Sequence, residues 1–189
     1  MNKSILIVGV GGQGTLLASK IMGKCFMDQG YDVKVGEVHG MSQRGGSVVT
    51  YVRYGDKVWS PVIEEGEADI IISFEQLESA RWLPYLKPGG VIISNTQKID
   101  PMPVIMGQAE YPDDVIGKIR ALGVRVEAVP AAELAMQAGT IKAANVVLLG
   151  AAAHFTDIDG QIWREAVRTT VPPKTTEVNL KAFDLGYNR

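Results

Sequence analysis

The chain has 189 residues, of which 46% are hydrophobic and 21% are charged. This length and balance are typical of one globular domain with a full core, and they exclude a disordered protein. Lysine and arginine number 19 against 21 acidic residues, which gives a net charge of -2. Because no excess of positive charge is available to hold nucleic acid or an anionic membrane, we expect neither as a partner.

The N-terminal segment and the cysteine content restrict location and cofactors. Only Lys3 precedes a strand-length apolar run, which fits neither a signal peptide nor a transmembrane helix, so a cytoplasmic location is predicted. Cys25 is the single cysteine of the sequence. One thiol cannot close a disulfide within the chain or hold an iron–sulfur cluster or a structural zinc. We therefore expect Cys25 to pack as a small apolar side chain on the first helix, and we expect no metal site.

The first strand, loop and helix are predicted at residues 4–8, 9–14 and 15–29, and Gly30 is suited to end the helix. Glycines in the loop satisfy the G-x-G-x-x-G pattern between a strand and a helix. Such a loop lets the backbone approach an anion, and the helix adds unpaired N–H groups and its positive dipole end. Alternatively, the glycines serve only a tight turn and close helix–strand packing. The candidate phosphate-binding or ligand-binding residues are Gly9, Gly11, Gly12, Gln13, Gly14 and Thr15.

A second polar loop follows the predicted strand at residues 31–38. It places an acid, an imidazole, an amide and a guanidinium close together among glycines. Arg44 offers a planar and permanently charged fork for a carboxylate or phosphate, although an arginine at a subunit interface would look the same. The candidates for an active-site edge or partner interface in this loop are Glu37, His39, Met41, Ser42, Gln43, Arg44, Gly45 and Gly46.

The remaining pattern is mostly an alternation of strands and helices. Residues 47–54 and 57–63 predict an antiparallel hairpin around Gly55-Asp56. The rest favours a single α/β domain with a mainly parallel, doubly wound (Rossmann-like) sheet and this early antiparallel hairpin. Further strands are predicted at 68–73, 91–95 and 124–129, helices at 75–86, 112–122, from about 131 and at 141–155, and one or two amphipathic helices within 157–189.

Several single residues have both a structural and a functional interpretation. Asn145 lies on an otherwise apolar helix, so its amide must find a partner in the backbone or in a ligand, and it joins the site-edge candidates. Thr140 is a predicted helix N-cap, and His154 a predicted helix C-cap or packing residue. Core packing is expected for the tryptophans, with any exposed part a candidate partner interface: Trp59, Trp82 and Trp163.

Two alternative classes of protein stay open at this point. The position of Glu37 near the end of the second strand matches the ribose-binding acid of a dinucleotide site, although a loop and a hairpin follow it where a helix is required. A free-standing dinucleotide-binding oxidoreductase or regulator is one alternative, and a purely structural partner with an empty glycine loop is the other. The sequence contains no Ser-His-Asp set, metal-ligand spacing or facing carboxylate pair, which disfavours an independent hydrolase or metalloenzyme.

The two loops resemble those of the gamma-type domain of 2-oxoacid:ferredoxin oxidoreductases. The first reads Gly9-Val10-Gly11-Gly12-Gln13-Gly14, and the more specific second reads Glu37-Val38-His39-Gly40-Met41-Ser42-Gln43-Arg44-Gly45-Gly46-Ser47-Val48. The resemblance covers nearly the whole chain, including Lys142-Ala143-Ala144-Asn145, so residues 1–189 would form one pyruvate/ketoisovalerate oxidoreductase gamma-type domain. Within the family, the chain resembles the small (beta) subunits of indolepyruvate-specific enzymes.

The resemblance implies a non-redox subunit that is not active alone. A large (alpha) subunit would carry thiamine diphosphate, magnesium and iron–sulfur clusters, and this chain would hold no cofactor by itself. The assembly would decarboxylate indolepyruvate or another arylpyruvate oxidatively to the aryl-acetyl-CoA, with coenzyme A as a substrate and ferredoxin as electron acceptor. Pyruvate, 2-oxoglutarate and branched-chain 2-oxoacids are alternative substrates.

The resemblance also implies roles for the two loops. Residues 37–46 would pack against the large subunit and close the active-site region. Arg44 and the amides of the glycine loop would supply positive potential for a carboxylate or a coenzyme A phosphate. An apolar partner interface is expected, because obligate subunits bury more apolar surface than transient ones.

Overall fold

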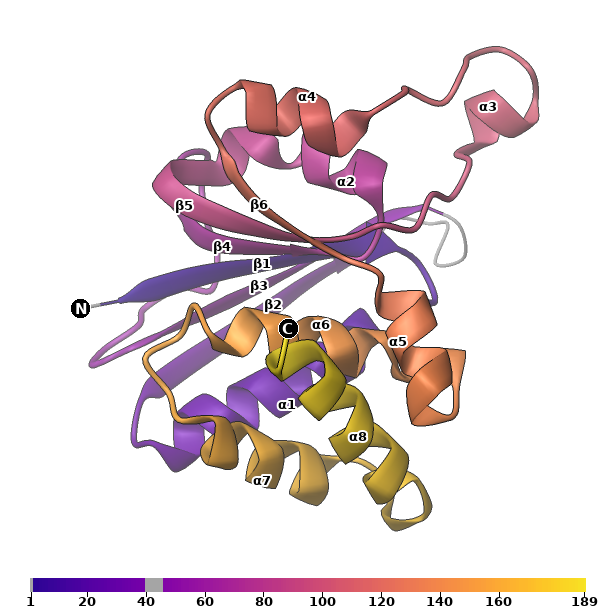
Figure 1. The fold of residues 1–189 in the computed structure, drawn as a ribbon. Coiled ribbons are helices and arrows are strands. Elements are labelled where there is room, and N and C mark those ends of the chain that lie inside the picture. Colours follow the sequence, from indigo (N-terminus) through magenta and orange to yellow (C-terminus); the bar gives the residue numbers. More distant parts are fainter. Residues whose placement is uncertain (1, 40–45) are drawn as a thin grey trace.

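The computed structural model describes residues 2–39 and 46–189, and in these residues the strands form one six-stranded sheet of order β2-β3-β1-β4-β5-β6 (Figure 1). β1 pairs in parallel with β4, β4 with β5 and β5 with β6, whereas β3 is antiparallel to both β1 and β2. The predicted α/β class and mainly parallel sheet are confirmed. The strands are β1 (Lys3–Val10), β2 (Asp32–His39), β3 (Ser47–Gly55), β4 (Ala68–Ser73), β5 (Leu86–Asn95) and β6 (Arg125–Val129).

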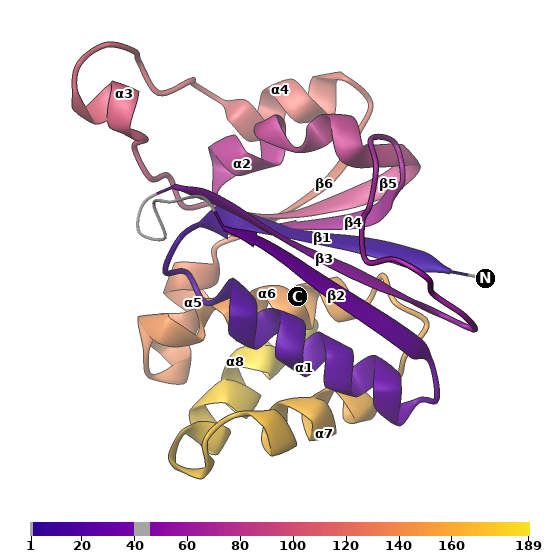
Figure 2. The same cartoon turned by 180° about the vertical axis from the view of Figure 1, so that it is seen from behind.

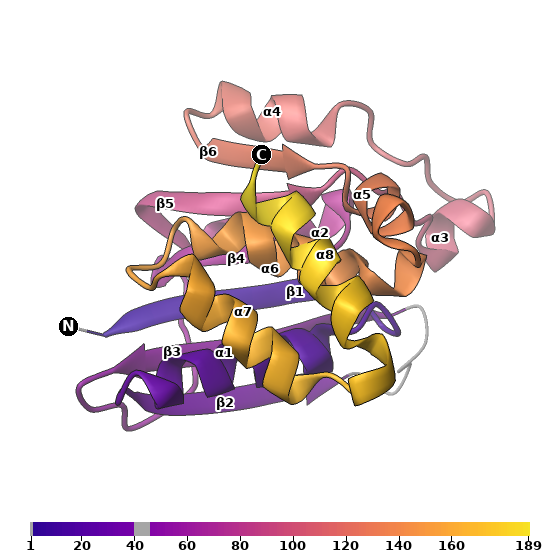
Figure 3. The ribbon, with the colours of Figure 1, turned by 60° about the horizontal axis from the view of Figure 1, so that its bottom comes forward.

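Helices cover the two faces of the sheet unequally. α2 and α4 lie on one face, and α1, α5, α6, α7 and α8 lie on the other (Figures 1 and 2). Figure 3 looks onto the thicker layer, where α8 lies across α6 and α7 runs beside α1. The helices are α1 (Thr15–Asp28), α2 (Gln76–Arg81), α3 (Met102–Ile105), α4 (Val115–Ala121), α5 (Ala131–Ala138), α6 (Ala144–Ala153), α7 (Gly160–Thr170) and α8 (Thr176–Tyr187), with short 3-10 helices at Leu83–Tyr85, Ile141–Ala143 and Pro173–Thr175.

Burial on both faces explains why β1 lies in the centre of the sheet. Ile5 and Ile7 belong to the core beneath α1 and α6, and Leu6 and Val8 to the core beneath α2 and α4. A continuous apolar run is typical of a strand covered on both sides. The apolar run of residues 4–8 therefore explains both why these residues form a strand and why that strand lies in the centre of the sheet.

The predicted hairpin of residues 47–54 and 57–63 is wrong in its second strand. β3 is present, but it already pairs with β1 on one side and β2 on the other, so no edge remains for residues 57–63. That segment is instead held by scattered side-chain bonds, among them those from the Val58 N–H to Asp32 at 2.9 Å and from Arg53 to the Val62 carbonyl at 2.8 Å, and by the burial of Val58 and Ile63. The early antiparallel hairpin of this fold is β2 with β3.

Prolines and caps account for most other differences in element bounds. The helix predicted at 75–86 ends as α2 at Arg81, because Pro84 continues the chain as a 3-10 helix. β5 begins at Leu86, five residues before the predicted strand, with an irregular ladder to β4. Thr140 caps the 3-10 helix before α6 as predicted, and Gly30 follows the end of α1 with φ of 84°. Of the one or two amphipathic helices expected within 157–189, two are present, and the chain breaks between them at Pro172 and Pro173.

The tryptophans do not share one environment. Trp163 is fully buried in the core, where its ring meets Phe26 edge-on at 5.6 Å between centroids. Trp59 is 87% exposed, because it lies on the segment that fails to join the sheet. Trp82 is half-buried. Core packing, the expectation for all three, is therefore wrong for Trp59.

Candidate functional site

The crevice at the carboxyl ends of β1 and β4 is the position where an open α/β sheet binds its ligands. From β1 the chain enters α1 on one face, and from β4 it enters α2 on the other face (Figure 1). The loops after the two strands therefore diverge, which is the topological switch point of doubly wound folds. A cavity of about 480 Å³ lies here, with Gly12, Gln13 and Gly14 in its wall.

The glycine loop turns through two left-handed residues. Gly12 has φ of 96° and Gly14, the N-cap of α1, has φ of 87°. No side chain caps the helix, and within the residues that the structure describes the N–H groups of Gly12 and Gly14 have no protein acceptor. Backbone donors and the positive dipole end of α1 thus face the cavity, an arrangement suited to an anion.

The side chain of Gln13 braces the loop internally. Its Oε1 accepts from the Val10 N–H at 2.8 Å, and its Nε2 donates to the Phe74 carbonyl at 3.0 Å. A Cβ on Gly9 would lie 2.8 Å from the same Oε1 and 3.0 Å from the Phe74 Cβ, so a side chain there would force one of these neighbours to move. Gln13 therefore links the ends of β1 and β4, and its side chain is already used within the protein.

Asn145 connects α6 to the glycine loop. Asn145 is 3% exposed, and its Nδ2 donates to the Gly14 carbonyl at 3.1 Å while its Oδ1 accepts from the Val146 N–H at 2.9 Å. Of the two partners that the sequence left open for this amide, the structure provides the backbone. Thr15, the last glycine-loop candidate, is buried as the first residue of α1.

Polar residues at the end of β5 and the start of α6 complete the cavity, and the sequence analysis missed them. Asn95 donates to the Phe74 carbonyl at 3.1 Å, and Gln97 accepts weakly from Gln13 Nε2 at 3.4 Å. Lys142 lies on the rim, exposed and, among the described residues, without an ion-pair partner. The signal for Asn95 and Gln97 was their place at the carboxyl end of a predicted parallel strand.

Apolar side chains form the remainder of the wall. Leu17 of α1, Ile99 after β5 and Ile141 before α6 line the cavity, together with Phe74, which follows β4. The cavity therefore combines anion-binding groups with an apolar lining. This combination suits an anionic organic molecule better than a bare inorganic ion.

The second loop adjoins the first at one hydrogen bond. The Gly11 N–H donates to the Gly46 carbonyl at 2.9 Å, because β1 and β3 pair antiparallel up to Val10 and Ser47. His39 ends β2 opposite Val48. The remaining candidates in this loop, Met41, Ser42, Gln43, Arg44 and Gly45, lie outside the described residues.

Glu37 is placed differently from the ribose-binding acid of a dinucleotide site. In that site β2 is next to β1, whereas here β3 separates them and puts Glu37 on the edge strand. Two strand spacings amount to about 10 Å. The Ser19 hydroxyl donates to Glu37 at 3.3 Å, which directs the carboxylate toward α1. This strand order disfavours the dinucleotide-binding alternative.

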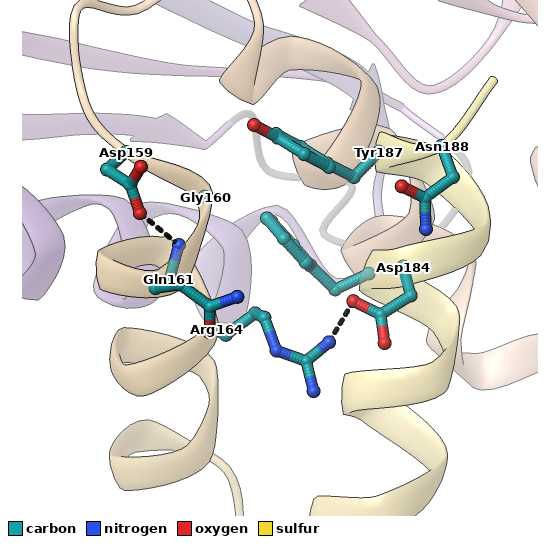
Figure 4. A pocket seen from close by; sticks show the side chains of 8 residues that line it. Asp159, Gly160, Gln161, Arg164, Asp184, Tyr187 and Asn188 are labelled. Atoms are coloured by element: carbon teal, nitrogen blue, oxygen red, sulfur yellow. Dashed lines mark hydrogen bonds and ion pairs between the residues drawn. The ribbon is translucent and has the colours of Figure 1, made fainter.

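A second cavity, of about 420 Å³, lies between α7 and α8 (Figure 4). Its charged groups are already satisfied: Arg164 pairs with Asp184, and Asp159 caps α7 by accepting from the Gln161 N–H at 2.8 Å. In the described part of the chain, no group of three or more histidine, cysteine or acidic residues is placed to hold a metal ion. No helix among these residues is long and apolar enough to cross a membrane.

A model of the family described as pyruvate ferredoxin/flavodoxin oxidoreductase matches residues 4–189. The chain belongs to the pyruvate ferredoxin/flavodoxin oxidoreductase family. This confirms the resemblance that the two loops indicated.

Three relatives match this chain over nearly their whole length. Proteins called "Indolepyruvate oxidoreductase subunit IorB" are 48% identical in Thermococcus kodakarensis, 45% in Pyrococcus horikoshii and 42% in Archaeoglobus fulgidus. The matches cover 97%, 97% and 100% of this chain and 93%, 93% and 96% of the relatives.

Two solved structures share the fold of this chain. The gamma subunit of a keto/oxoacid ferredoxin oxidoreductase from Geobacter sulfurreducens superimposes with a TM-score of 0.74 at 24% identity, covering 98% of this chain and 96% of that one. A 2-oxoglutarate:ferredoxin oxidoreductase chain from Magnetococcus marinus gives 0.76 at 20% identity, covering 99% of this chain but 30% of its own. At these identities the likeness establishes the fold alone.

Proposed function

We propose that this chain is the small subunit of an indolepyruvate:ferredoxin oxidoreductase. Together with a large subunit it converts indolepyruvate or another arylpyruvate to the aryl-acetyl-CoA, with coenzyme A as co-substrate and ferredoxin as electron acceptor. Indolepyruvate is proposed as the substrate because the chain is 42–48% identical to three relatives named for indolepyruvate. A relative named "2-oxoglutarate synthase subunit KorC" from Methanothermobacter thermautotrophicus is 33% identical, which makes 2-oxoglutarate the next substrate to test.

The redox cofactors are assigned to the large subunit. The donor set of this chain does not fit an iron–sulfur cluster, because its single cysteine is buried in the core. Nor do the described residues offer an acidic cluster for the magnesium ion of a thiamine diphosphate. Thiamine diphosphate, magnesium and iron–sulfur clusters would therefore be held by the partner, and this chain would be inactive alone.

The contribution of this chain is to bind the anionic part of coenzyme A in the cleft. The N–H groups of Gly12 and Gly14, the dipole end of α1 and the Lys142 ammonium supply positive potential on one side of the cavity. The apolar wall beside them suits the organic part of the same molecule. Arg44 is proposed to add charge from the second loop, and that loop to pack against the large subunit.

The test is a kinetic comparison of variants in the complex reconstituted with its large subunit. Lys142→Gln is expected to raise the KM for coenzyme A about tenfold, the effect of losing roughly one charge-assisted contact, while kcat changes little. Lys174→Gln, at an exposed lysine of the 3-10 helix Pro173–Thr175, is the matched control. An unchanged KM in both Lys142→Gln and Arg44→Ala would remove the coenzyme A role.

The substrate is tested separately, with the wild-type complex and a panel of 2-oxoacids. Indolepyruvate is expected to give the highest kcat/KM, above pyruvate, 2-oxoglutarate and branched-chain oxoacids. A preference for any of these others would keep the family assignment and replace the substrate. Failure of the purified chain to associate with a large subunit would instead contradict the subunit assignment.

A further inference from the structure

Two buried carboxylates lie beside the cleft without facing it. Glu75 caps α2 and Glu78 lies in its first turn, with exposed fractions of 1% and 4%. Neither side chain lines the cavity. Buried carboxylates must be hydrogen-bonded to be tolerated, so their donors indicate what they do.

Glu75 holds both ends of the segment that carries α3. Its Oε1 accepts from the Ile99 N–H at 3.2 Å and from the Tyr111 hydroxyl, and its Oε2 accepts from the Glu78 N–H at 3.0 Å. Ile99 belongs to the cavity wall, whereas Tyr111 lies at the far end of the segment. Between them the chain stands away from the body of the protein (Figures 1 and 2). One carboxylate thus ties a wall of the cleft to the sheet.

Glu78 holds the point where the two glycine-containing loops meet. Its Oε2 accepts from the Ser47 hydroxyl at 2.5 Å and from the Trp82 indole N–H at 3.3 Å, and its Oε1 from Arg81 at 3.1 Å. Ser47 directly follows Gly46, whose carbonyl accepts the Gly11 N–H. The carboxylate therefore lies one residue away from the bond that anchors the glycine loop.

We propose that Glu75 and Glu78 are positioning residues of the cleft: Glu75 fixes the Ile99 wall, and Glu78 fixes the Gly11–Gly46 junction. Both act from the start of α2, and neither carboxylate lines the cavity itself. The kinetic part of this proposal rests on the proposed function, in which the cleft binds coenzyme A. The structural part concerns the amides of Gly11 and Ile99 alone.

Three substitutions separate positioning from simple stabilisation. Ser47→Ala removes the donor that links Glu78 to the loop junction, and Tyr111→Phe removes the hydroxyl that donates to Glu75. Trp82→Phe is the matched control, because it removes another donor from the same Glu78 oxygen while leaving the junction bonded. Each variant is measured in the reconstituted complex for KM and kcat with coenzyme A, and in the full chain for amide hydrogen exchange.

Ser47→Ala is expected to raise the KM for coenzyme A about tenfold, with kcat unchanged and faster exchange of the Gly11 N–H. Tyr111→Phe is expected to do the same with faster exchange at Ile99, and Trp82→Phe to alter neither quantity. The proposal is overturned if Ser47→Ala and Tyr111→Phe match Trp82→Phe in both readouts, even where the melting temperature falls. If the wild-type complex has no coenzyme A-dependent activity, the proposed function fails, while the exchange rates still decide the positioning role.

Discussion

The side-chain amide of Asn145 donates to the carbonyl oxygen of Gly14 at 3.1 Å, across 131 positions of sequence. This bond joins the start of α6 to the turn that begins α1, so two walls of the cleft are fixed to each other. A Cβ on Gly14 would lie 2.7 Å from the same Asn145 nitrogen. The glycine at position 14 therefore serves the packing of α6 as well as the turn.

Asn145→Ala is expected to destabilise the fold and weaken ligand binding. Removing the amide leaves the Val146 N–H without the Asn145 acceptor, and it takes one of two donors from the Gly14 carbonyl, which keeps the Ala18 N–H. The expected loss is about 1–3 kcal/mol in the free energy of unfolding. Asn179→Ala is the control, because its Nδ2 donates to the Thr175 carbonyl at 2.8 Å away from the cleft. Urea unfolding should show a loss in both variants, and calorimetry with coenzyme A a loss of affinity in Asn145→Ala only. If Asn145→Ala bound coenzyme A as tightly as Asn179→Ala does, a role for Asn145 in the cleft would be contradicted.

Gly14→Ala is expected to cost more than Gly30→Ala. Both glycines have positive φ, 87° and 84°, so alanine pays about 1–2 kcal/mol for the left-handed conformation at either position. Only at Gly14 does the added methyl group also meet a neighbour, since Gly30 has open space around it. Denaturant titration of the two variants measures the difference in their free energies of unfolding. Equal losses of stability would show that Asn145 moves aside without cost.

Cys25 is expected to be inert toward thiol reagents in the folded protein. Burial raises the pKa of the Cys25 thiol to about 12, with a smaller contribution from the nearby Asp28 carboxylate. The reactive thiolate is then nearly absent at pH 8, and the side chain is also inaccessible. Titration with a chromogenic disulfide should detect no thiol in the native chain and one after unfolding in guanidinium. Rapid labelling of native protein would refute the buried placement.

Asp32 is expected to make stability depend on pH at the acid end. Hydrogen bonds from Lys34 and from the Val58 N–H lower the pKa of Asp32 below its usual value of 3.8. A lowered pKa means that the carboxylate stabilises the folded state above about pH 4, and that this contribution disappears as the pH falls through the lower folded pKa.

The Asp32 effect is measured as the difference in melting temperature between wild type and Asp32→Asn. The difference should be full at pH 7 and should shrink below pH 4. Asp100→Asn, at an exposed carboxylate, serves as control and should show little difference at any pH. If the difference in melting temperature for Asp32→Asn stayed constant down to pH 2, the effect would come from the geometry of the side chain and not from its charge.

Local sequence patterns correctly predicted the parts of the fold that depend on neighbouring residues. The first strand, glycine loop and helix follow from apolar spacing over a few turns, and Gly30 and Thr140 act within one turn of their own helix ends. The glycine loop was recognised for the same reason, because its geometry depends on glycines adjacent in the chain. The two loops also carried enough specific residues to indicate the family.

Tertiary structure alone decided which segments became neighbours. Residues 57–63 have the composition of a strand, but β2 and β1 occupy both edges of β3, and a strand has only two edges to pair. The partner of Asn145, the bracing by Gln13 and the buried bonds of Glu75 and Glu78 likewise join residues far apart in sequence. Sequence determined the elements and the family because those signals are local, whereas the walls of the cleft depend on hydrogen bonds that exist only once the sheet order is set.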